Sequence, residues 1–265
     1  MLTITDLHVD IGNLKIIQGI TLDIKDGEIV SLIGANGAGK TTLIRAISGL
    51  GHITGGTVKF MDRDITGATT EQIVDAGLIQ IPEGRQLFPL MTVRENLEIG
   101  AHTKLAKKNM RNNLEYVYSL FPELKEMSSK AAGNLSGGQQ QMVAVGRGIM
   151  AEPKLLILDE PSIGLSPIMT QRVLKAVIDI HNKGVAVLIA EQNIHDVLRI
   201  ANRAYVLEQG LIRAEGKATD LLNNPAGEKD LFGTPMSWQP APDGKGVAFT
   251  AQAHTAYLFD CNMLA

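Results

Sequence analysis

Three shortages in the 265-residue sequence each exclude a class of protein. The single cysteine, Cys261, has no second cysteine to pair with, so an internal disulfide framework is excluded. The formal net charge is −3 and the isoelectric point is about 6.1, so the surface lacks the basic field that would draw the whole protein onto nucleic acid or anionic lipid. The charge does not by itself exclude nucleic acid, but it gives such a partner no support, and we expect none.

Long hydrophobic runs are also missing. The longest, at residues 185–190 and 155–158, fall far below the ~20 residues that a helix needs to cross a bilayer. If the protein works at a membrane, another chain supplies the span. The first residues, Met-Leu-Thr-Ile-Thr-Asp, lack the basic and apolar regions of a secretory signal, so we expect a place on the cytosolic side.

The hydrophobic residues that are present, 45% of the chain, suffice for a buried core and follow two patterns. Residues 2–9 and 20–24 alternate apolar and polar side chains, which indicates antiparallel strands with one face in water. Other runs are short and almost continuously apolar, which indicates strands buried on both faces of a parallel sheet. These runs are residues 29–33, 155–158 and 185–190. Helical stretches such as 170–183 lie between them, so the order of elements predicts an α/β fold with an antiparallel edge sheet.

Two segments depart from this alternation of strands and helices. Residues 92–150 carry no strand signal, and the charged stretch 104–127 within them is typical of helices interrupted by Pro122. We expect a helical subdomain there, inserted into a core made of residues 1–91 and 151–231. Residues 232–265 are expected to be an extension of unknown role. It begins with a linker, because residues 233–246 hold three prolines and three glycines, and residues 246–259 are expected to form a hairpin.

The octapeptide Gly-Ala-Asn-Gly-Ala-Gly-Lys-Thr at positions 34–41 matches a phosphate-binding loop, and it lies between a predicted strand and a helix at 41–48. Small residues let backbone N–H groups close around a β-phosphate, and the start of the helix adds partial positive charge. Lys40 is expected to reach the β- and γ-phosphate oxygens, and the Thr41 hydroxyl to ligate Mg²⁺. The expected nucleotide-binding residues are Gly34, Ala35, Asn36, Gly37, Ala38, Gly39, Lys40, Thr41 and Thr42.

Two carboxylates, Asp159 and Glu160, follow the apolar strand at 155–158. At the carboxyl edge of a parallel sheet, Asp159 is expected to hold Mg²⁺, and Glu160 to polarise the attacking water as a general base. By itself, Asp-Glu after a strand is often a solvated turn. The phosphate loop in the same chain favours the catalytic interpretation.

A third motif consists of Leu135, Ser136, Gly137, Gly138 and Gln139, ahead of a helix predicted at 139–150. Ser136 is placed to cap this helix, and the two glycines leave backbone donors open, so the segment predicts a second anion site. In isolation the same five residues would be an ordinary helix start.

The three motifs in this order resemble the ATP-binding cassette of ABC transporters, over about residues 1–231. The resemblance implies a P-loop NTPase with a RecA-like core, an antiparallel edge sheet and an inserted helical subdomain. It implies ATP and Mg²⁺ as cofactors and ATP hydrolysis as the activity. It also implies that two cassettes associate head to tail, so that the signature segment 135–139 of one chain completes the phosphate loop of the other.

Four positions depart from the general cassette pattern. Ile11 and Ser166 stand where an aromatic residue on adenine and an aspartate are common. Glu83 stands where a glutamine usually ligates Mg²⁺ and senses the membrane subunit, and as a carboxylate it can still ligate a hard cation. Gln192 stands where a histidine usually contacts the γ-phosphate, and it can still donate a hydrogen bond. We therefore expect Glu83 among the metal ligands and Gln192 among the catalytic residues.

These departures have two interpretations. One is a cassette that binds ATP but hardly hydrolyses it, as the regulatory partner of a second cassette. The other is a subfamily fingerprint, because residues 81–88, 91–97 and 190–193 resemble the ATPase subunits of branched-chain amino-acid importers. In those importers, as in related urea and amide importers, two different ATPase chains serve one transporter. Import of branched-chain amino acids is then the expected function, with urea, amides or another ABC cargo as the alternative.

The subfamily resemblance also implies partners and a location. The partners are transmembrane permease subunits, a second ABC ATPase chain in a heterodimer or a homodimer, and indirectly a substrate-binding protein. The location is the cytoplasmic face of the inner membrane, held there peripherally. Phe88 to Met91 are expected to form an exposed apolar segment beside Glu83, where the family places the groove for the membrane subunit, with core packing of Phe88 as the alternative.

Overall fold

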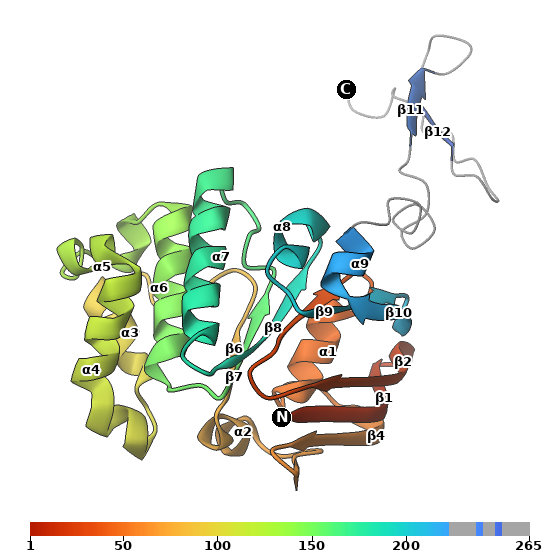
Figure 1. The fold of residues 1–265 in the computed structure, drawn as a ribbon, viewed down its shortest axis with the longest axis horizontal. Helices are drawn as coiled ribbons and strands as arrows, with labels where there is room; N and C mark the ends of the chain where they lie inside the picture. Colours follow the sequence, from red (N-terminus) through yellow and green to blue (C-terminus); the bar gives the residue numbers. More distant parts are fainter. Residues whose placement is uncertain (223–236, 241–246, 251–265) are drawn as a thin grey trace. The chain divides into compact units, whose positions relative to one another are not determined.

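The computed structural model of the protein describes residues 1–222, 237–240 and 247–250. The chain divides into two compact units, Met1–Leu222 and Asn223–Ala265. All the candidate site residues belong to the first unit, which ends nearer the amino terminus than the predicted boundary at Leu231. Figure 1 shows the course of the chain from β1 to α9 through this unit.

The first unit is built on a six-stranded sheet in the order β10-β9-β3-β8-β7-β6. Five of its strands run parallel, and β10 (Leu211–Lys217) pairs antiparallel with β9 at one edge. The parallel strands are β3 (Ile29–Ile33), β6 (Leu78–Ile81), β7 (Leu155–Asp159), β8 (Ala186–Glu191) and β9 (Arg203–Glu208). Three of these are the apolar runs noted in the sequence, so the predicted parallel core is confirmed.

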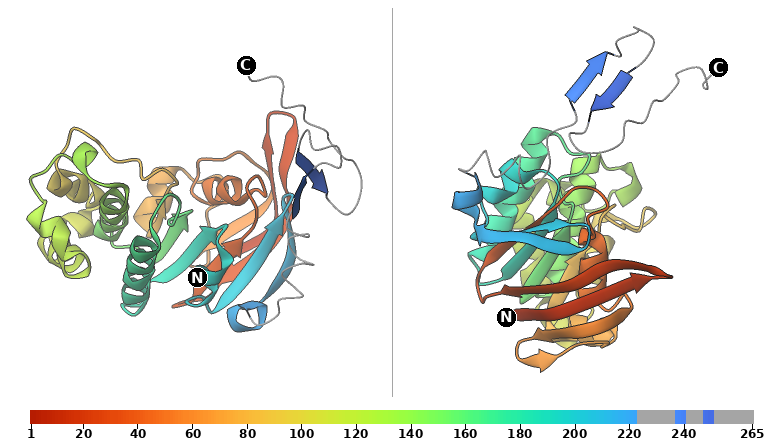
Figure 2. Two further views of the ribbon diagram at one scale, coloured as in Figure 1. Left: turned by 90° about the horizontal axis from the view of Figure 1, so that it is seen from above. Right: turned by 90° about the vertical axis from the view of Figure 1, so that its right-hand side faces the viewer.

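A second sheet of four antiparallel strands has the order β2-β1-β4-β5. Its strands are β1 (Leu2–Ile11), β2 (Leu14–Ile24), β4 (Ile53–Phe60) and β5 (Arg63–Asp64). The alternating apolar pattern of β1 and β2 matches a sheet that is buried on one face only. The predicted antiparallel sheet is therefore present. The right-hand view of Figure 2 shows β1, β2 and β4 side by side at the edge of the unit.

Helices occupy the stretch from residue 93 to residue 150, and Figures 1 and 2 both show them gathered at the end of the first unit that lies away from the antiparallel sheet. Pro122 stands in the first turn of the helix after the interruption, a position that does not require its missing N–H group. The elements are α3 (Val93–Gly100), α4 (Lys104–Leu120), α5 (Pro122–Glu126), the short 3₁₀ turn η1 (Ala132–Asn134) and α6 (Gly137–Met150).

Of the other helices, the sequence pattern predicted two, at 41–48 and 170–183. The helix expected at 170–183 is α7 (Pro167–His181), which begins earlier because Ser166 is its N-cap and Pro167 its first residue. The remaining helices are α1 (Lys40–Ile47), α2 (Thr70–Ala76), α8 (Ile194–Leu198) and α9 (Ala218–Leu222).

Two hydrophobic clusters cover the two faces of the parallel sheet. In β7, Leu156 and Leu158 belong to the cluster that contains the side chains of α3 to α7, whereas Leu155 and Ile157 belong to the cluster of α1 and the antiparallel sheet. Successive strand residues point to opposite faces, which is why a continuous apolar run is needed here. Helix α1 thus lies between the two sheets (Figure 1), and the phosphate loop that precedes it is held by both.

The second unit corrects the prediction for the tail. Strand β11 (Ser237–Pro240) lies inside the predicted linker and pairs antiparallel with β12 (Val247–Thr250). The hairpin is therefore centred earlier than residues 246–259, and residues 251–265, with Cys261, lie outside the described residues. The strand was missed because the composition of fourteen residues does not reveal a strand of only four residues within them. Pro240 is tolerated because it is the last residue of that strand.

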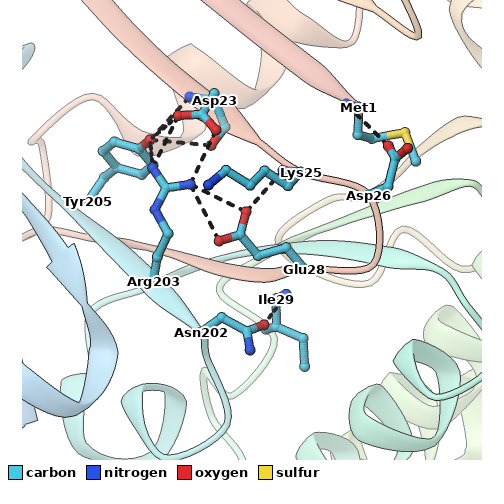
Figure 3. Close-up of polar contacts among 9 residues, drawn as sticks. All are labelled: Met1, Asp23, Lys25, Asp26, Glu28, Ile29, Asn202, Arg203 and Tyr205. Carbon is cyan, nitrogen blue, oxygen red and sulfur yellow. Dashed lines mark hydrogen bonds and ion pairs between the residues drawn. The ribbon is translucent and has the colours of Figure 1, made fainter.

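An ionic network joins the two sheets at the end opposite the phosphate loop (Figure 3). Arg203 on β9 donates to Asp23 on β2 at 3.1 Å, to the buried Glu28 at 3.3 Å and to the Tyr205 hydroxyl at 2.6 Å. The hydrogen bonds from Arg203 lower the pKa of Asp23 and hold it ionised. Tyr205 also accepts the backbone N–H of Asp23 at 3.1 Å, so the guanidinium and the phenol together fasten β2 to β9.

We expect Arg203→Met to lower the free energy of unfolding by about 2 kcal/mol, because Glu28 would remain in a nearly buried site without its cation. Urea unfolding of the full chain measures this. The matched control is Arg213→Met, since Arg213 and Glu208 pair on the surface with 44% and 52% of their side chains exposed. That variant should lose less than about 1 kcal/mol. Equal losses in the two variants would contradict a special role for the Arg203 network.

Candidate functional site

Two glycines shape the phosphate loop, and each position requires glycine for a different reason. A Cβ on Gly34 would collide with the carbonyl oxygen of Leu207, so the loop passes closer to β9 than any side chain allows. Gly39 has φ 109°, which is a left-handed conformation, and it is the N-cap of α1 without a side-chain hydrogen bond to the helix. The first N–H groups of α1 therefore keep their capacity for an anion.

Lys40 is buried and makes three contacts with its ammonium group. It donates to the carbonyl oxygens of Gly34 at 2.7 Å and Ala35 at 3.2 Å, and it forms an ion pair with Oε1 of Glu160 at 2.9 Å. The side chains of Lys40 and Glu160 are 5% and 9% exposed, so neither charge is screened by water. The cation of the loop and the carboxylate after β7 thus neutralise each other in the free chain.

Asp159 ends β7 and faces the start of α1. The Thr41 hydroxyl donates to its Oδ1 at 3.3 Å, while its Oδ2 is buried and has no hydrogen-bond partner among the described residues. Burial raises the pKa of Asp159 to about 6, and the neighbouring carboxylates of Glu160 and Glu83 act in the same direction. A buried acceptor of this kind is stabilised by a cation beside it.

Glu160 stands in a strained backbone conformation at the tip of β7. Its φ is 48°, in the left-handed region that residues with a side chain seldom adopt. Its own N–H donates to Ala190 O at 2.9 Å, and its Oε2 accepts the N–H of Gln192 at 3.3 Å. These contacts hold the carboxylate between the ends of β7 and β8.

A pocket of 430 Å³ opens over these groups. Its walls bring together residues that are far apart in the chain, among them Glu83 and Thr41, two of the three expected metal ligands. The lining residues are Ile16, Asn36, Gly37, Gly39, Lys40, Thr41, Thr42, Glu83, Glu160 and Ile163. One face of a nucleotide-sized cavity thus carries backbone donors, a lysine, hydroxyls and carboxylates, which is the set that a magnesium–nucleotide complex requires.

Other predicted site residues lie around this pocket or away from it. The Gln192 side chain is exposed, and it reaches the site through its backbone contact with Glu160. Ile11 is 58% exposed. The signature residues 135–139 are absent from the lining of this pocket, since they belong to the start of α6, which Figures 1 and 2 place among the helices of residues 93–150.

The start of α6 has the predicted capping geometry. The Ser136 hydroxyl accepts the N–H of Gln139 at 3.4 Å, and the Gln139 side chain accepts the N–H of Ser136 at 2.9 Å. This reciprocal pair is a capping box. On the other side, Gly138 packs closely against the Met169 side chain, which would have to move to admit a Cβ there.

One acidic residue of the site was missed in the sequence. Glu191 ends β8, is 3% exposed, and accepts the N–H of Ser162 at 2.8 Å. Burial raises its pKa to about 7, and the adjacent Glu160 adds to the shift. The available signal was its position, because Glu191 follows an apolar strand just as Asp159 does.

Magnesium fits the donor set beside the loop. Within the described ranges there is no cluster of three or more His, Cys, Asp or Glu side chains arranged as a metal cage. Mg²⁺ does not need one, since it commonly binds through one or two carboxylates together with substrate phosphates and water. The partnerless Oδ2 of Asp159, the Thr41 hydroxyl and the Glu83 carboxylate are hard oxygen donors of the required kind.

Residues 17–163 match the family described as ABC transporter. This stretch is more than half of the chain and includes the phosphate loop, the signature segment and the Asp159–Glu160 pair. The chain belongs to the ABC transporter family. It is an ABC-type ATPase with the α/β fold of the P-loop NTPases, as its motifs indicated.

Relatives of this ABC cassette match it along most of their length. The high-affinity branched-chain amino acid transport ATP-binding protein BraG of Pseudomonas aeruginosa is 39% identical over 85% of this chain and 96% of its own. BraF of the same organism, which has the same description, is 30% identical over 85% of this chain and 94% of its own. Among solved structures, the ADP conformation of an ATP-binding cassette of an ABC transporter has a TM-score of 0.74 and 29% identity, covering 85% of this chain and 96% of that one.

The raised pKa of Glu191 predicts how the stability of this ABC cassette changes with pH. Because the folded-state pKa lies above the ordinary value of 4.5, the folded chain binds this proton more tightly than the unfolded chain does. The contribution to stability is complete below the ordinary value and is lost as the pH rises through about 7. Glu191→Gln cannot ionise, so relative to the native chain it should gain about 1–3 kcal/mol of unfolding free energy between pH 5 and pH 8.

Urea unfolding at the two pH values, without nucleotide or metal, measures this difference. Glu126→Gln, on the exposed end of α5, is the control and should differ from the native chain by the same small amount at both pH values. A stability difference between the Glu191→Gln and native chains that is the same at both pH values would contradict a pKa of about 7 for Glu191.

Proposed function

We propose that this chain is the ATP-hydrolysing subunit of an importer of branched-chain amino acids. The observation that carries the proposal is the pocket lined by Lys40, Thr41 and Glu160, in a chain that is similar to BraG over nearly all of BraG's length. The cargo rests on that similarity alone. A related importer of urea or amides, or another ABC system, is the alternative cargo.

In the proposed reaction the phosphate loop binds ATP through residues 34–42. Mg²⁺, held by Thr41, Asp159 and Glu83, would neutralise charge on the phosphate oxygens. Glu160 orients a water molecule and takes its proton as the water oxygen attacks the γ-phosphorus. The bond from that phosphorus to the bridging oxygen breaks, and ADP leaves with the electron pair. Gln192 donates a hydrogen bond to the γ-phosphate.

The ion pair between Lys40 and Glu160 makes ATP binding precede the activation of water by Glu160. While the ammonium is paired with Glu160 at 2.9 Å, the lysine is not available to a phosphate and one carboxylate oxygen is not available to water. Triphosphate oxygens compete for the ammonium, since they carry more charge and lie at the start of α1. Binding of ATP thus frees Glu160 for the water molecule.

The signature residues 135–139 are proposed to act on the ATP of another chain. Their backbone donors and the capped start of α6 suit an anion, yet they are separate from the pocket of their own chain. Pseudomonas aeruginosa has two different relatives of this chain, BraG and BraF. We therefore favour a heterodimer with a second ABC cassette, with a homodimer as the alternative.

A second pocket of 430 Å³, mostly apolar, is proposed to receive a permease subunit. Its rim includes the exposed side chains of Leu50, Phe88 and Ile99. Phe88 is 48% exposed and Leu90 95%, so the expected apolar segment is exposed from Phe88 to Leu90, whereas Met91 is half-buried. Apolar surface at the edge of a groove is typical of a docking site for a partner. None of the helices in the described ranges has both the length and the apolar character to cross a bilayer, and we propose a peripheral place on the cytoplasmic face of the inner membrane.

The segment between Glu83 and this groove is tied to the signature helix. Arg147 on α6 donates to the carbonyl oxygens of Arg85 at 2.9 Å and Gln86 at 2.8 Å, and Arg85 donates to Gln140 at 3.2 Å. A shift of the segment at the groove would therefore move α6. We propose that residues 92–150 form a subdomain on a core of residues 1–91 and 151–231, with residues 232–265 as an extension, and that these contacts couple the subdomain to the groove.

The base assignment is tested with Glu160→Gln. We expect the rate of phosphate release to fall by at least about 100-fold, because the amide cannot accept the proton of the water. ATP binding and ATP-induced association of chains should persist, since Lys40 is released from its ion pair. Phosphate release and size-exclusion chromatography with ATP measure the two effects. Turnover at the native rate would refute the role of Glu160 and with it the proposed mechanism.

The docking groove is tested with Ile99→Glu, which places a charge on its rim. We expect loss of assembly with the permease subunits, measured by co-purification, while the purified chain keeps its ATPase activity. Leu105→Glu on α4 is the matched control, since Leu105 is 61% exposed and does not line the groove. Assembly that is equally sensitive to both substitutions would place the permease contact elsewhere.

A further inference from the structure

Glu191 lies in the site without a role in the reaction described above. It is the last residue of β8 and is almost fully buried beside the carboxyl group of Glu160. Most buried carboxylates are paired with a cation, but Lys40, the cation of the phosphate loop, is already paired with Glu160. A buried acid next to the proposed base therefore requires an explanation.

Three hydrogen bonds connect the ends of β7 and β8 at this point. The N–H of Glu160 donates to Ala190 O at 2.9 Å, the N–H of Gln192 to Glu160 at 3.3 Å, and the N–H of Ser162 to Glu191 at 2.8 Å. The third depends on a side chain from β8. The Glu191 carboxyl group therefore links the segment after Glu160 to the end of β8.

The segment that Glu191 contacts leads directly into the wall of the nucleotide pocket. Ile163 follows Ser162, donates its N–H to Glu160 O at 3.2 Å and lines the pocket over the phosphate loop. Ser166 lies a few residues further on and is the N-cap of α7. One buried side chain thus contacts both the proposed base and the turn that forms the pocket wall.

The charges at the strand ends favour a proton on Glu191. The carboxyl groups of Glu160 and Glu191 are within hydrogen-bonding reach, and two negative charges in a buried site repel each other. Lys40 stabilises the negative charge on Glu160, and burial raises the pKa of Glu191. A neutral Glu191 has one O–H to donate and one carbonyl oxygen to accept, which matches Glu160 on one side and the Ser162 N–H on the other.

We propose that Glu191 is a positioning residue for ATP hydrolysis, which donates to Glu160, accepts from Ser162 and so fixes the base against the pocket wall. The inference rests on the proposed role of Glu160 as the general base. It assigns Glu191 no contact with ATP or water. Its effect is on the orientation of Glu160 in the step where the proton is taken.

The test compares Glu191→Gln with Glu191→Ala in the full purified chain with Mg²⁺ and ATP. The glutamine amide keeps one donor and one acceptor, so we expect kcat within about threefold of the native value. The alanine variant loses both contacts, and its kcat should fall about 10- to 100-fold while KM for ATP stays unchanged, because a base out of position costs rate but not binding. Rescue by glutamine and the split between kcat and KM would not arise from general destabilisation.

The control is Leu188→Ala, which creates a cavity at another fully buried position of the same strand. It should lower the thermal unfolding midpoint, with kcat of the folded chain unchanged. If Glu191→Ala does not fold, Glu191→Leu fills the volume without donor or acceptor and serves in its place. A native kcat in the alanine or leucine variant would overturn the proposal, as would a glutamine variant as slow as alanine.

The outcome for Glu160→Gln keeps this inference separate from the proposed function. If Glu160→Gln is inactive and Glu191→Ala turns over at the native rate, the general base stands and the positioning role of Glu191 is wrong. If Glu160→Gln hydrolyses ATP normally, the proposed function fails first, and the inference fails with it.

Discussion

Parallel pairing of β3, β8 and β7 in one register is the constraint on which the site depends. Ile33 at the end of β3 is opposite Glu191, and Ala190 is opposite Asp159 at the end of β7. The phosphate loop that follows Ile33 and the carboxylates at the ends of β7 and β8 therefore meet at one sheet edge. A shift of one residue in either pairing would turn these side chains toward the opposite face of the sheet.

The side chains at this edge of the sheet include more acidic groups than basic groups to pair with them. Lys40 pairs with Glu160, while Asp159 keeps a buried oxygen without a partner among the described residues and Glu191 has its pKa raised. Burying carboxylates in this way costs stability, and that cost is characteristic of sites prepared for a ligand. Hydrophobic packing on both faces of the sheet, above and below β7, offsets it.

The groups that suit anions lie at two separate places in the chain. The pocket holds the groups that bind and cleave a nucleotide, and the capped start of α6 holds the groups that suit a second anion. Arg147 and Arg85 connect that helix to the segment between Glu83 and the apolar groove. These contacts therefore connect the proposed site for a partner cassette with the proposed permease groove.

The sequence by itself determined the parts whose chemistry is local. The glycine-rich loop before a helix, the Ser136 capping box and the apolar runs of β3, β7 and β8 each follow from residues that are neighbours in the chain. Their order was enough to predict the fold class and the family. It was not enough for the hairpin of β11 and β12, because a pairing partner cannot be chosen from composition.

Tertiary structure alone decided which of the charged residues meet. Nothing in the spacing of residues 40, 160 and 191 shows that Lys40 pairs with Glu160, or that Glu191 lies buried behind it, since these contacts depend on strand order and register. The same holds for Arg203, whose partners Asp23 and Glu28 come from elements far away in the chain. Coulomb energy and burial depend on distance in space, and only the folded sheet sets that distance.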